Sequence, residues 1–203
     1  NSFEYGQSMY GIQNLLNQNQ QSFKDTTLLG NFIDNQDNAR FLNGNGNVQF
    51  FKSALIFTIF NRNLFFKLEG IPIVYYGDEQ YYSGGNDPNN REVLWPNFFT
   101  DSAIYQILKQ FNGIRTNLQI WNYDQVQKYA DDNFYAFTRG NVLYAAFTNS
   151  MNTQTRTMIN LPFPENAVLC SAQDGYDCVT VHNGSFEITL MVGQFKIYLV
   201  RSY

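Results

Sequence analysis

The sequence is poor in the residues that several kinds of binding site require. Its 203 residues include 13 Lys and Arg against 17 Asp and Glu, which gives a net charge of −4, and one histidine. A nucleic-acid interface needs clustered basic side chains against the phosphates, so this balance argues against a nucleic-acid partner. The sequence has no run of about 18 apolar residues, the length that spans a membrane, and its longest apolar stretches, 54–60 and 71–76, are core-sized.

A recognisable targeting segment is also lacking. The sequence begins at Asn1, without a Met, a basic leader or the apolar stretch of a signal peptide. We therefore interpret the sequence as a processed product or an excised piece, and targeting cannot be deduced from its first residues.

Cysteine is scarce, with Cys170 and Cys178 the two present. Asp174-Gly175 between them is a turn signal, so the flanking residues can fold back as a hairpin and bring the sulfurs together. We expect a disulfide, which would imply an oxidising compartment. Two half-buried thiols are the alternative. A metal site is disfavoured because two more ligands are needed and His182 is the one histidine.

Aromatic residues, in contrast, are plentiful. The chain has 19 Phe, 14 Tyr and 2 Trp, and it is 44% hydrophobic, which is too apolar for a disordered protein. Aromatic rings and amide side chains are the usual lining of sugar-binding clefts. A large hydrophobic core gives the same counts, and on composition alone the core is the favoured explanation.

The pattern of the sequence changes near residue 122, which predicts two domains, 1–122 and 123–203. In the first, helical periodicity and short apolar runs alternate, in the order strand, helix, strand, helix that is typical of parallel α/β folds. Residues 43–46 predict a loop, and Thr100 or Asp101 is the expected N-cap of the last helix. Predicted helices are 9–18, 47–66 and 101–118, and predicted buried strands are 27–33 and 71–76.

The second domain is predicted to be all-β, a small antiparallel Greek-key β-sandwich. Gly140-Asn141 and Asn183-Gly184 are hairpin turn signals. Acidic residues do not cluster in this part, so we expect a structural role for it. The predicted strands are 134–138, 142–148, 155–161, 178–181, 186–190 and 195–200.

Polar and acidic residues gather just after both predicted strands of the first domain, at the edge where parallel α/β proteins carry their chemistry. Residues 32–41 read Phe-Ile-Asp-Asn-Gln-Asp-Asn-Ala-Arg-Phe, with Asp37 a few residues past the strand and Arg40 close behind. A fixed carboxylate here can accept sugar hydroxyls or stabilise the positive charge of glycosidic cleavage. The alternative is a polar turn that satisfies backbone groups.

The second polar segment, 84–92, reads Gly-Gly-Asn-Asp-Pro-Asn-Asn-Arg-Glu. Asp87 and Arg91 bracket a turn fixed by Pro88, and they could pair with each other or bind the vicinal hydroxyls of a ligand. Alone, this segment indicates no more than a turn-rich loop. Glu79 lies where the strand ends, and we assign it no catalytic role.

Together the two segments resemble the alpha-amylase family of glycoside hydrolases. Residues 32–41 resemble Phe-Val-Asp/Glu-Asn-His-Asp-Asn-Pro-Arg-Phe at the seventh barrel strand of that family. Residues 70–80 and 84–92 resemble the eighth strand and its loop in fungal-type members, and 26–30 resemble the family's lead-in. The resemblance is strong over residues 22–120, and the β tail matches the family's small C-terminal sandwich domain in type.

This resemblance implies the C-terminal portion of a (β/α)8 TIM barrel in a retaining hydrolase of α-1,4-glucosidic bonds in starch or glycogen. By resemblance, Asp37 matches the third catalytic carboxylate, which grips sugar hydroxyls and stabilises the transition state. Asp87 and Arg91 match substrate contacts, and Gln36 and Arg40 are further candidate substrate-binding residues. The implied ligand is an α-glucan, and the implied cofactor is calcium, whose ligands we expect outside this chain. The expected location is secreted, vacuolar or lysosomal.

Three departures from the family pattern matter. The family's nucleophilic Asp and acid/base Glu lie on earlier strands, so we expect these 203 residues alone not to hydrolyse starch, and the rest of the barrel to be needed. Gln36 stands at the family's His position, and an amide can donate a hydrogen bond but cannot carry a proton. The stretch around 60–67 is longer than in the family, as an elongated helix or a sequence artefact.

Three functions therefore stay open. The first is part of an alpha-amylase-type enzyme, and the second is a non-catalytic carbohydrate-binding or degenerate amylase-like protein. The third is a packing module without a ligand.

Overall fold

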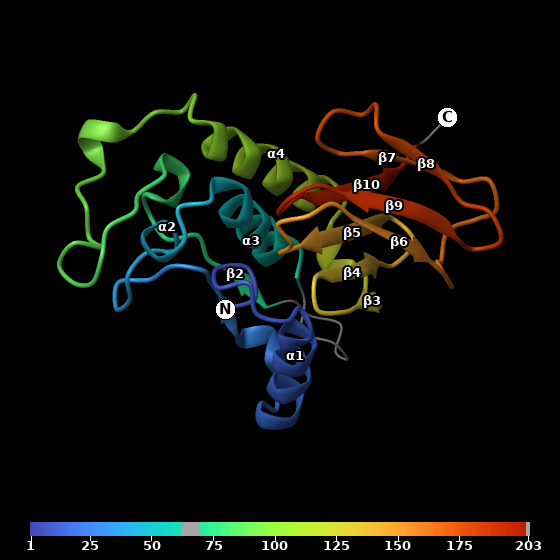
Figure 1. Cartoon of the computed structure of the whole chain (residues 1–203), viewed down its shortest axis with the longest axis horizontal. Helices are drawn as coiled ribbons and strands as arrows, with labels where there is room; N and C mark the ends of the chain where they lie inside the picture. Colours follow the sequence, from blue (N-terminus) through green and yellow to red (C-terminus); the bar gives the residue numbers. More distant parts are fainter. Residues whose placement is uncertain (62–69, 202–203) are drawn as a thin grey trace.

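The computed structural model describes residues 1–61 and 70–201, with helices in the first half and strands in the second (Figure 1). The α-helices are α1 (Tyr10–Ser22), α2 (Phe41–Gly44), α3 (Val48–Phe60) and α4 (Ala103–Asn117). Short 3-10 turns are η1 (Thr26–Leu28), η2 (Asp78–Gln80), η3 (Trp95–Asn97) and η4 (Ile120–Asn122). The strands are β1 (Gly30–Asn31), β2 (Ile71–Pro72), β3 (Gln125–Ala130), β4 (Phe134–Arg139), β5 (Leu143–Thr148), β6 (Gln154–Met158), β7 (Val168–Ser171), β8 (Cys178–Thr180), β9 (Phe186–Leu190) and β10 (Phe195–Val200).

The three longer helices lie where helical periodicity predicted them. Helix α3 begins after Asn47, whose side-chain oxygen accepts the backbone N–H groups of Gln49 and Phe50 at 2.9 and 3.3 Å. The predicted extension of this helix to residue 66 and the long stretch at 60–67 fall largely on 62–69, outside the described residues. Among the described residues, no helix combines the length and apolar character needed to cross a bilayer.

Two local predictions were wrong. The segment 43–46, predicted as a loop, overlaps the one-turn helix α2, in which Asn45 donates its backbone N–H to Phe41. Helix α4 begins at Ala103, two residues after the predicted start at 101, with Ser102 as N-cap in place of Thr100 or Asp101. The Ser102 hydroxyl donates to the carbonyl of Glu79 at 2.5 Å, so this residue ties the start of α4 to η2.

Strands β1 and β2 are shorter than predicted and pair in parallel, with Gly30 opposite Ile71. The residues around them are not buried as predicted, since Ile71 is 57% and Phe32 is 49% exposed. A parallel sheet is normally covered by helices on both faces. Among the described residues, β1 and β2 pair with each other alone. Their parallel pairing directs the following loops to one edge.

The second half contains a six-stranded sheet in the order β3-β4-β5-β10-β7-β8 and a two-stranded sheet, β6-β9. Each pairing within these sheets is antiparallel, as predicted. Strands β3 and β7 were not predicted. The hairpin turns at Gly140-Asn141 and Asn183-Gly184 were predicted. Both Asn183 and Gly184 have positive φ, as a type I′ turn requires.

The centre of the six-stranded sheet is covered on both faces, because every residue of β4 and β5 is buried. Side chains of Tyr135, Phe137 and Phe147 point to one face, where Phe57 of α3 lies 5.5 Å from Phe147 between ring centroids. Alternate side chains such as Tyr144 point to the other face, against β6 and β9. Figure 1 shows α3 and α4 beside these strands. The domain boundary at 122/123 stays a prediction.

Arg139 joins the two halves of the chain. It is fully buried at the end of β4 and donates to the carbonyls of Phe60 at 2.7 Å, Ile120 at 2.7 Å and Tyr123 at 3.0 Å. The C-terminal end of α3 is therefore satisfied by a side chain from the β half.

The predicted disulfide is confirmed. Cys170 of β7 and Cys178 of β8 face each other across an antiparallel hairpin and are bonded. Asp174 accepts the backbone N–H of Tyr176 at 2.9 Å in the turn between them, where the turn signal was found.

Candidate active site at the ends of two parallel strands

The two polar segments singled out from the sequence lie in contact. They follow β1 and β2, and the backbone N–H of Arg40 donates to the carbonyl of Gly84 at 3.0 Å. Side chains of the second loop also reach the first, because Asn90 donates to the carbonyls of Gln36 and Asn38 at 2.9 and 2.7 Å. The structure thus brings together residues 52–54 positions apart.

Asp37 lies exposed on the first loop. The side-chain oxygen of Asn35 accepts the backbone N–H groups of Asp37 and Asn38 at 2.9 and 3.0 Å, which forms an Asx turn. The amide of Gln36 donates to Asp37 Oδ2 at 3.1 Å. The carboxylate is therefore accessible to a ligand while its backbone is fixed.

Asp87 and Arg91 lie on the second loop and pair with each other, with Asp87 Oδ1 3.4 Å from Arg91 Nε. Their side chains are about half exposed, at 54% and 48%. An exposed pair of this kind contributes at most about 1 kcal/mol, so a ligand can replace it at small cost. Arg91 Nη2 also donates to the carbonyl of Gln36 at 3.3 Å, which places the guanidinium next to the Asp37 loop.

Arg40, predicted as a substrate contact, is fully buried, so the structure gives it a different role. Its guanidinium donates to Glu92 at 2.8 Å, to Asp78 at 3.1 Å and to the carbonyl of Tyr76 at 2.9 Å. The ring of Tyr75 covers it, with 4.5 Å from Cζ to the ring centroid. Arg40 therefore joins the two loops beneath the surface and does not reach a ligand.

Two buried carboxyl groups, missed as site residues from the sequence, complete this cluster. Asp34 Oδ1 accepts the backbone N–H of Phe41 at 2.8 Å. Its other carboxyl oxygen and Asp78 Oδ2 are buried without a hydrogen-bond donor among the described residues. Burial is the main cause that raises the pKa of Asp78 to about 8, with the Asp34 charge adding to it and Arg40 opposing it. Burial also raises the pKa of Asp34, against the lowering effects of Phe41, Asp78 and Arg40.

Glu92 was also missed, and it fixes the start of its own loop. One carboxylate oxygen accepts the backbone N–H of Gly84 at 2.6 Å while the other accepts from Arg40. A side chain at Gly84 would meet the backbone of Asn89, so the close approach requires glycine. Glu79, assigned no catalytic role, accepts the N–H of Gly77 at 2.9 Å in a local turn.

The sequence carried a signal for part of this cluster. Asp34 and Asp78 each lie within two residues of the end of a predicted strand, so their gathering at one edge could be expected. Which carboxylates are exposed and which pair with Arg40 depends on distances that the residue types do not reveal.

The described residues do not form a metal centre. Between 1 and 61 and between 70 and 201, no three His, Cys, Asp or Glu side chains gather in the manner of a metal site. Two of the acidic side chains in this cluster, Asp78 and Glu92, already contact Arg40. These described residues do not fit a calcium ion.

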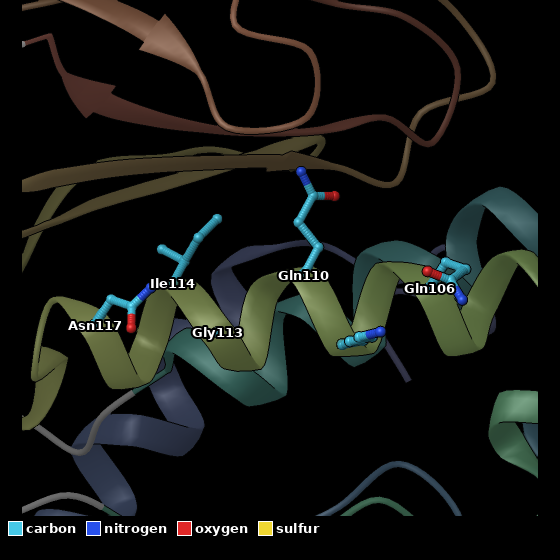
Figure 2. A pocket seen from close by; sticks show the side chains of 6 residues that line it. Gln106, Gln110, Gly113, Ile114 and Asn117 are labelled. Atoms are coloured by element: carbon cyan, nitrogen blue, oxygen red, sulfur yellow. The ribbon is translucent and has the colours of Figure 1, made fainter. Parts of the chain in front are cut away.

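A shallow open depression lies along α4, separate from the Asp37 loops. Figure 2 shows Gln110 and Ile114 projecting from α4 on the side of the neighbouring strands. The amide of Gln110 donates to the carbonyl of Ala172 at 2.7 Å, so part of its lining is already bound within the protein. The residues that line this depression are Gln106, Lys109, Gln110, Gly113, Ile114 and Asn117.

Comparison with known proteins agrees with this geometry. No family model matches the chain. A beta/alpha-amylase of Paenibacillus polymyxa is 36% identical over 208 residues, which cover 97% of this chain and 17% of that protein. A cyclomaltodextrin glucanotransferase of Bacillus sp. (strain 38-2) is 33% identical over 150 residues, covering 72% of this chain and 20% of that protein.

The fold has the same relatives. The solved alpha-amylase of Malbranchea cinnamomea superposes with a TM-score of 0.88 at 28% identity, over 98% of this chain and 43% of that one. The chain thus spans less than half the length of each of these three proteins. Over the length that it spans, the chain belongs to the alpha-amylase family of glycoside hydrolases.

Proposed function

We propose that this chain forms part of an alpha-amylase-type glycoside hydrolase acting on α-1,4-linked glucans such as starch and glycogen. In this proposal β1 and β2 are two strands of a (β/α)8 barrel. The observation that carries it is the exposed Asp37 on a fixed loop, with Asp87 and Arg91 on the loop directly beside it.

Asp37 would act on the sugar at the cleavage point. Cleavage of a glycosidic bond passes through a transition state with positive charge on the sugar ring, and a fixed carboxylate stabilises that charge. Its oxygens also accept hydrogen bonds from sugar hydroxyls. Asp87 and Arg91 would bind the hydroxyls of a neighbouring glucose unit, once the sugar replaces their weak mutual pair.

The retaining reaction also needs a nucleophile and an acid/base, two carboxyl groups about 5–5.5 Å apart. We propose that residues outside these 203 supply them and that this chain alone does not cleave glucans. Calcium, if the whole protein binds it, would likewise be held outside the described residues. The confirmed disulfide supports a secreted, vacuolar or lysosomal location, because disulfides persist in oxidising compartments.

Gln36 favours a second candidate, a protein that binds glucans without cleaving them. Its amide hydrogen-bonds Asp37, the carboxylate that the proposed reaction uses. A glutamine at this position retains a donor for a sugar hydroxyl but has no titratable proton.

Hydrolysis of starch and maltotetraose by the full product of the gene tests the proposal, with the 203-residue chain measured in parallel. We expect cleavage by the full product alone. Asp37→Asn should lower it about 100- to 1,000-fold, since a preorganised transition-state contact is lost. Asp132→Asn, the same change at an exposed position in the β half, is the control and should leave cleavage unchanged.

The products distinguish the remaining outcomes. Linear short oligosaccharides indicate hydrolysis, while cyclic products would indicate transfer of the kind that the glucanotransferase relatives are named for. Binding of glucans by the full product without any cleavage would favour the second candidate. If the full product neither binds nor cleaves glucans, both candidates are overturned and the packing module is left.

A further inference from the structure

Asn90 is a buried side chain of the second loop, and its hydrogen bonds go to another loop and not to a helix or strand. Its relative exposure is 0%, and it lies between the two exposed residues Asn89 and Arg91. The two hydrogens of its amide nitrogen reach the carbonyl oxygens of Gln36 at 2.9 Å and Asn38 at 2.7 Å. Both bonds cross from the second loop to the first.

The two carbonyls belong to the residues on either side of Asp37. A single amide group therefore fixes the backbone both before and after the candidate catalytic carboxylate. The Asx turn from Asn35 fixes the N–H groups of the same segment, so these backbone groups are held from two directions. This arrangement limits how far the Asp37 carboxylate can move.

The chemistry at this position requires donors and no acceptor. Among the described residues, no hydrogen-bond donor contacts Asn90 Oδ1, although that oxygen is buried. The amide nitrogen faces two carbonyl oxygens, so rotating the amide by half a turn would place oxygen against oxygen. An aspartate has the same shape as asparagine but, when ionised, offers acceptors alone.

We propose that Asn90 is a positioning residue for Asp37, and that it affects catalysis by holding the Asp37 backbone where the carboxylate meets the sugar. This inference rests on the proposed function. Misplacing a reacting group by about 1 Å can cost about 100-fold in rate, so loss of the two bonds should be visible in turnover.

Steady-state hydrolysis of an activated aryl maltotrioside by the full gene product is the test. We expect Asn90→Asp to lower kcat about 10- to 100-fold with a smaller change in KM, and Asn90→Ala to act in the same direction. Asn89→Asp makes the same chemical change at the exposed neighbouring position and should leave both constants within about twofold. If Asn90→Asp fails to fold, Asn90→Ala carries the comparison.

A double-mutant cycle separates positioning from general stability. If Asn90 acts through Asp37, Asn90→Ala should change the residual activity of Asp37→Asn by less than about threefold. Equal losses from Asn90→Ala in both backgrounds would overturn the proposal, as would unchanged kinetics in the Asn90 variants.

A measurement without sugar keeps this inference distinct from the proposed function. Amide hydrogen exchange in the full gene product should become faster at Asp37 and Asn38 in Asn90→Ala but not in Asn89→Ala. Faster exchange together with a full product that cleaves nothing would overturn the proposed function while leaving the backbone hold intact. Unchanged exchange would overturn the hold itself.

Discussion

Arg40 Nη1 lies 3.1 Å from Asp78 Oδ1, and both side chains are removed from water. The pair joins the loop after β1, which carries the candidate catalytic residue Asp37, to the loop after β2. A buried arginine of this kind is held by several acceptors at once, here Asp78, Glu92 and the carbonyl of Tyr76. The exposed part of the site therefore depends on a charged cluster that never contacts the ligand.

Replacing this arginine should be costly. Arg40→Met removes the cation while the Glu92 carboxylate and the carbonyl of Tyr76, which accept from it, stay in place. Removing one member of a buried charged cluster typically costs about 3–5 kcal/mol. We expect a loss of that size in the free energy of unfolding, measured by urea denaturation at pH 7.

Arg91→Met is the matched control for stability, since Arg91 is 48% exposed and pairs with an exposed Asp87. Its effect should stay within about 1 kcal/mol. Comparable losses in the two variants would contradict the special position of Arg40.

The buried carboxyl pair predicts a pH dependence. The pKa of Asp78 is raised to about 8 in the folded chain, mainly by burial, against about 4 in an unfolded chain. Between these values the folded state holds a proton that the unfolded state has released. The contribution of this group to stability is therefore complete below about pH 4 and is lost as the pH rises toward 8.

Urea denaturation at several pH values between 5 and 8 checks this prediction. One such proton contributes at most about 1.4 kcal/mol per pH unit to the decline in unfolding free energy. Asp78→Asn should flatten the decline, and Asp132→Asn should not. A wild-type curve that rises over this range, or an unchanged slope in Asp78→Asn, would speak against a protonated Asp78 in the folded chain.

Gln36 allows a gain-of-function test. In Gln36→His the family's residue is restored, and the imidazole N–H can donate to a sugar hydroxyl. We expect kcat/KM for maltotetraose to rise about 2- to 10-fold in the full gene product, because a protonated imidazole is a stronger donor than the neutral amide that it replaces. Gln36→Ala, which removes the donor, should change it in the opposite direction. If Gln36→His lowers activity, the glutamine is suited to this site and is no sign of decay.

The disulfide should contribute to stability through its loop. Closing a loop between residues eight positions apart removes unfolded-state entropy worth about 2–3 kcal/mol. Replacing Cys170 and Cys178 together by Ser should lower the unfolding free energy by that amount, and reductant should bring the parent chain to the same value. Thiol titration under denaturing, non-reducing conditions should find no free thiol, and two per chain would contradict the bond.

Much of the fold could be predicted from the sequence because periodicity reports burial. The stripe of apolar residues at 9, 12, 15 and 16 places α1, although Leu15 is 56% exposed, and turn signals place the hairpins. Strand β3 escaped prediction because it is an edge strand of mixed polarity whose register shifts between Gln127 and Tyr129. Strand β7 escaped prediction because its 4 residues are too few to show a clear pattern, although burial alternates along it.

The sequence could predict where the candidate site lies, but not which of its carboxylates are exposed and which are buried. Asp34, Asp37 and Asp78 all follow predicted strands, yet one is exposed and two are buried against Arg40. Burial of Arg40 depends on the positions of Glu92 and Tyr75, more than 30 residues away. Residue types alone give no measure of those distances, so a buried brace and a substrate contact look the same in the sequence.

Because β4 and β5 are covered on both faces, the β half cannot be separated from the helices without exposing apolar side chains. If the chain were cut after residue 122, the face that packs against α3 and α4 would become a water-facing row of aromatic and aliphatic side chains. Such a surface favours association between copies of the protein over the monomeric state. The β half therefore carries its own vulnerability to aggregation, which the helices mask. The row consists of Tyr135, Phe137, Leu143, Ala145, Phe147 and Ile197.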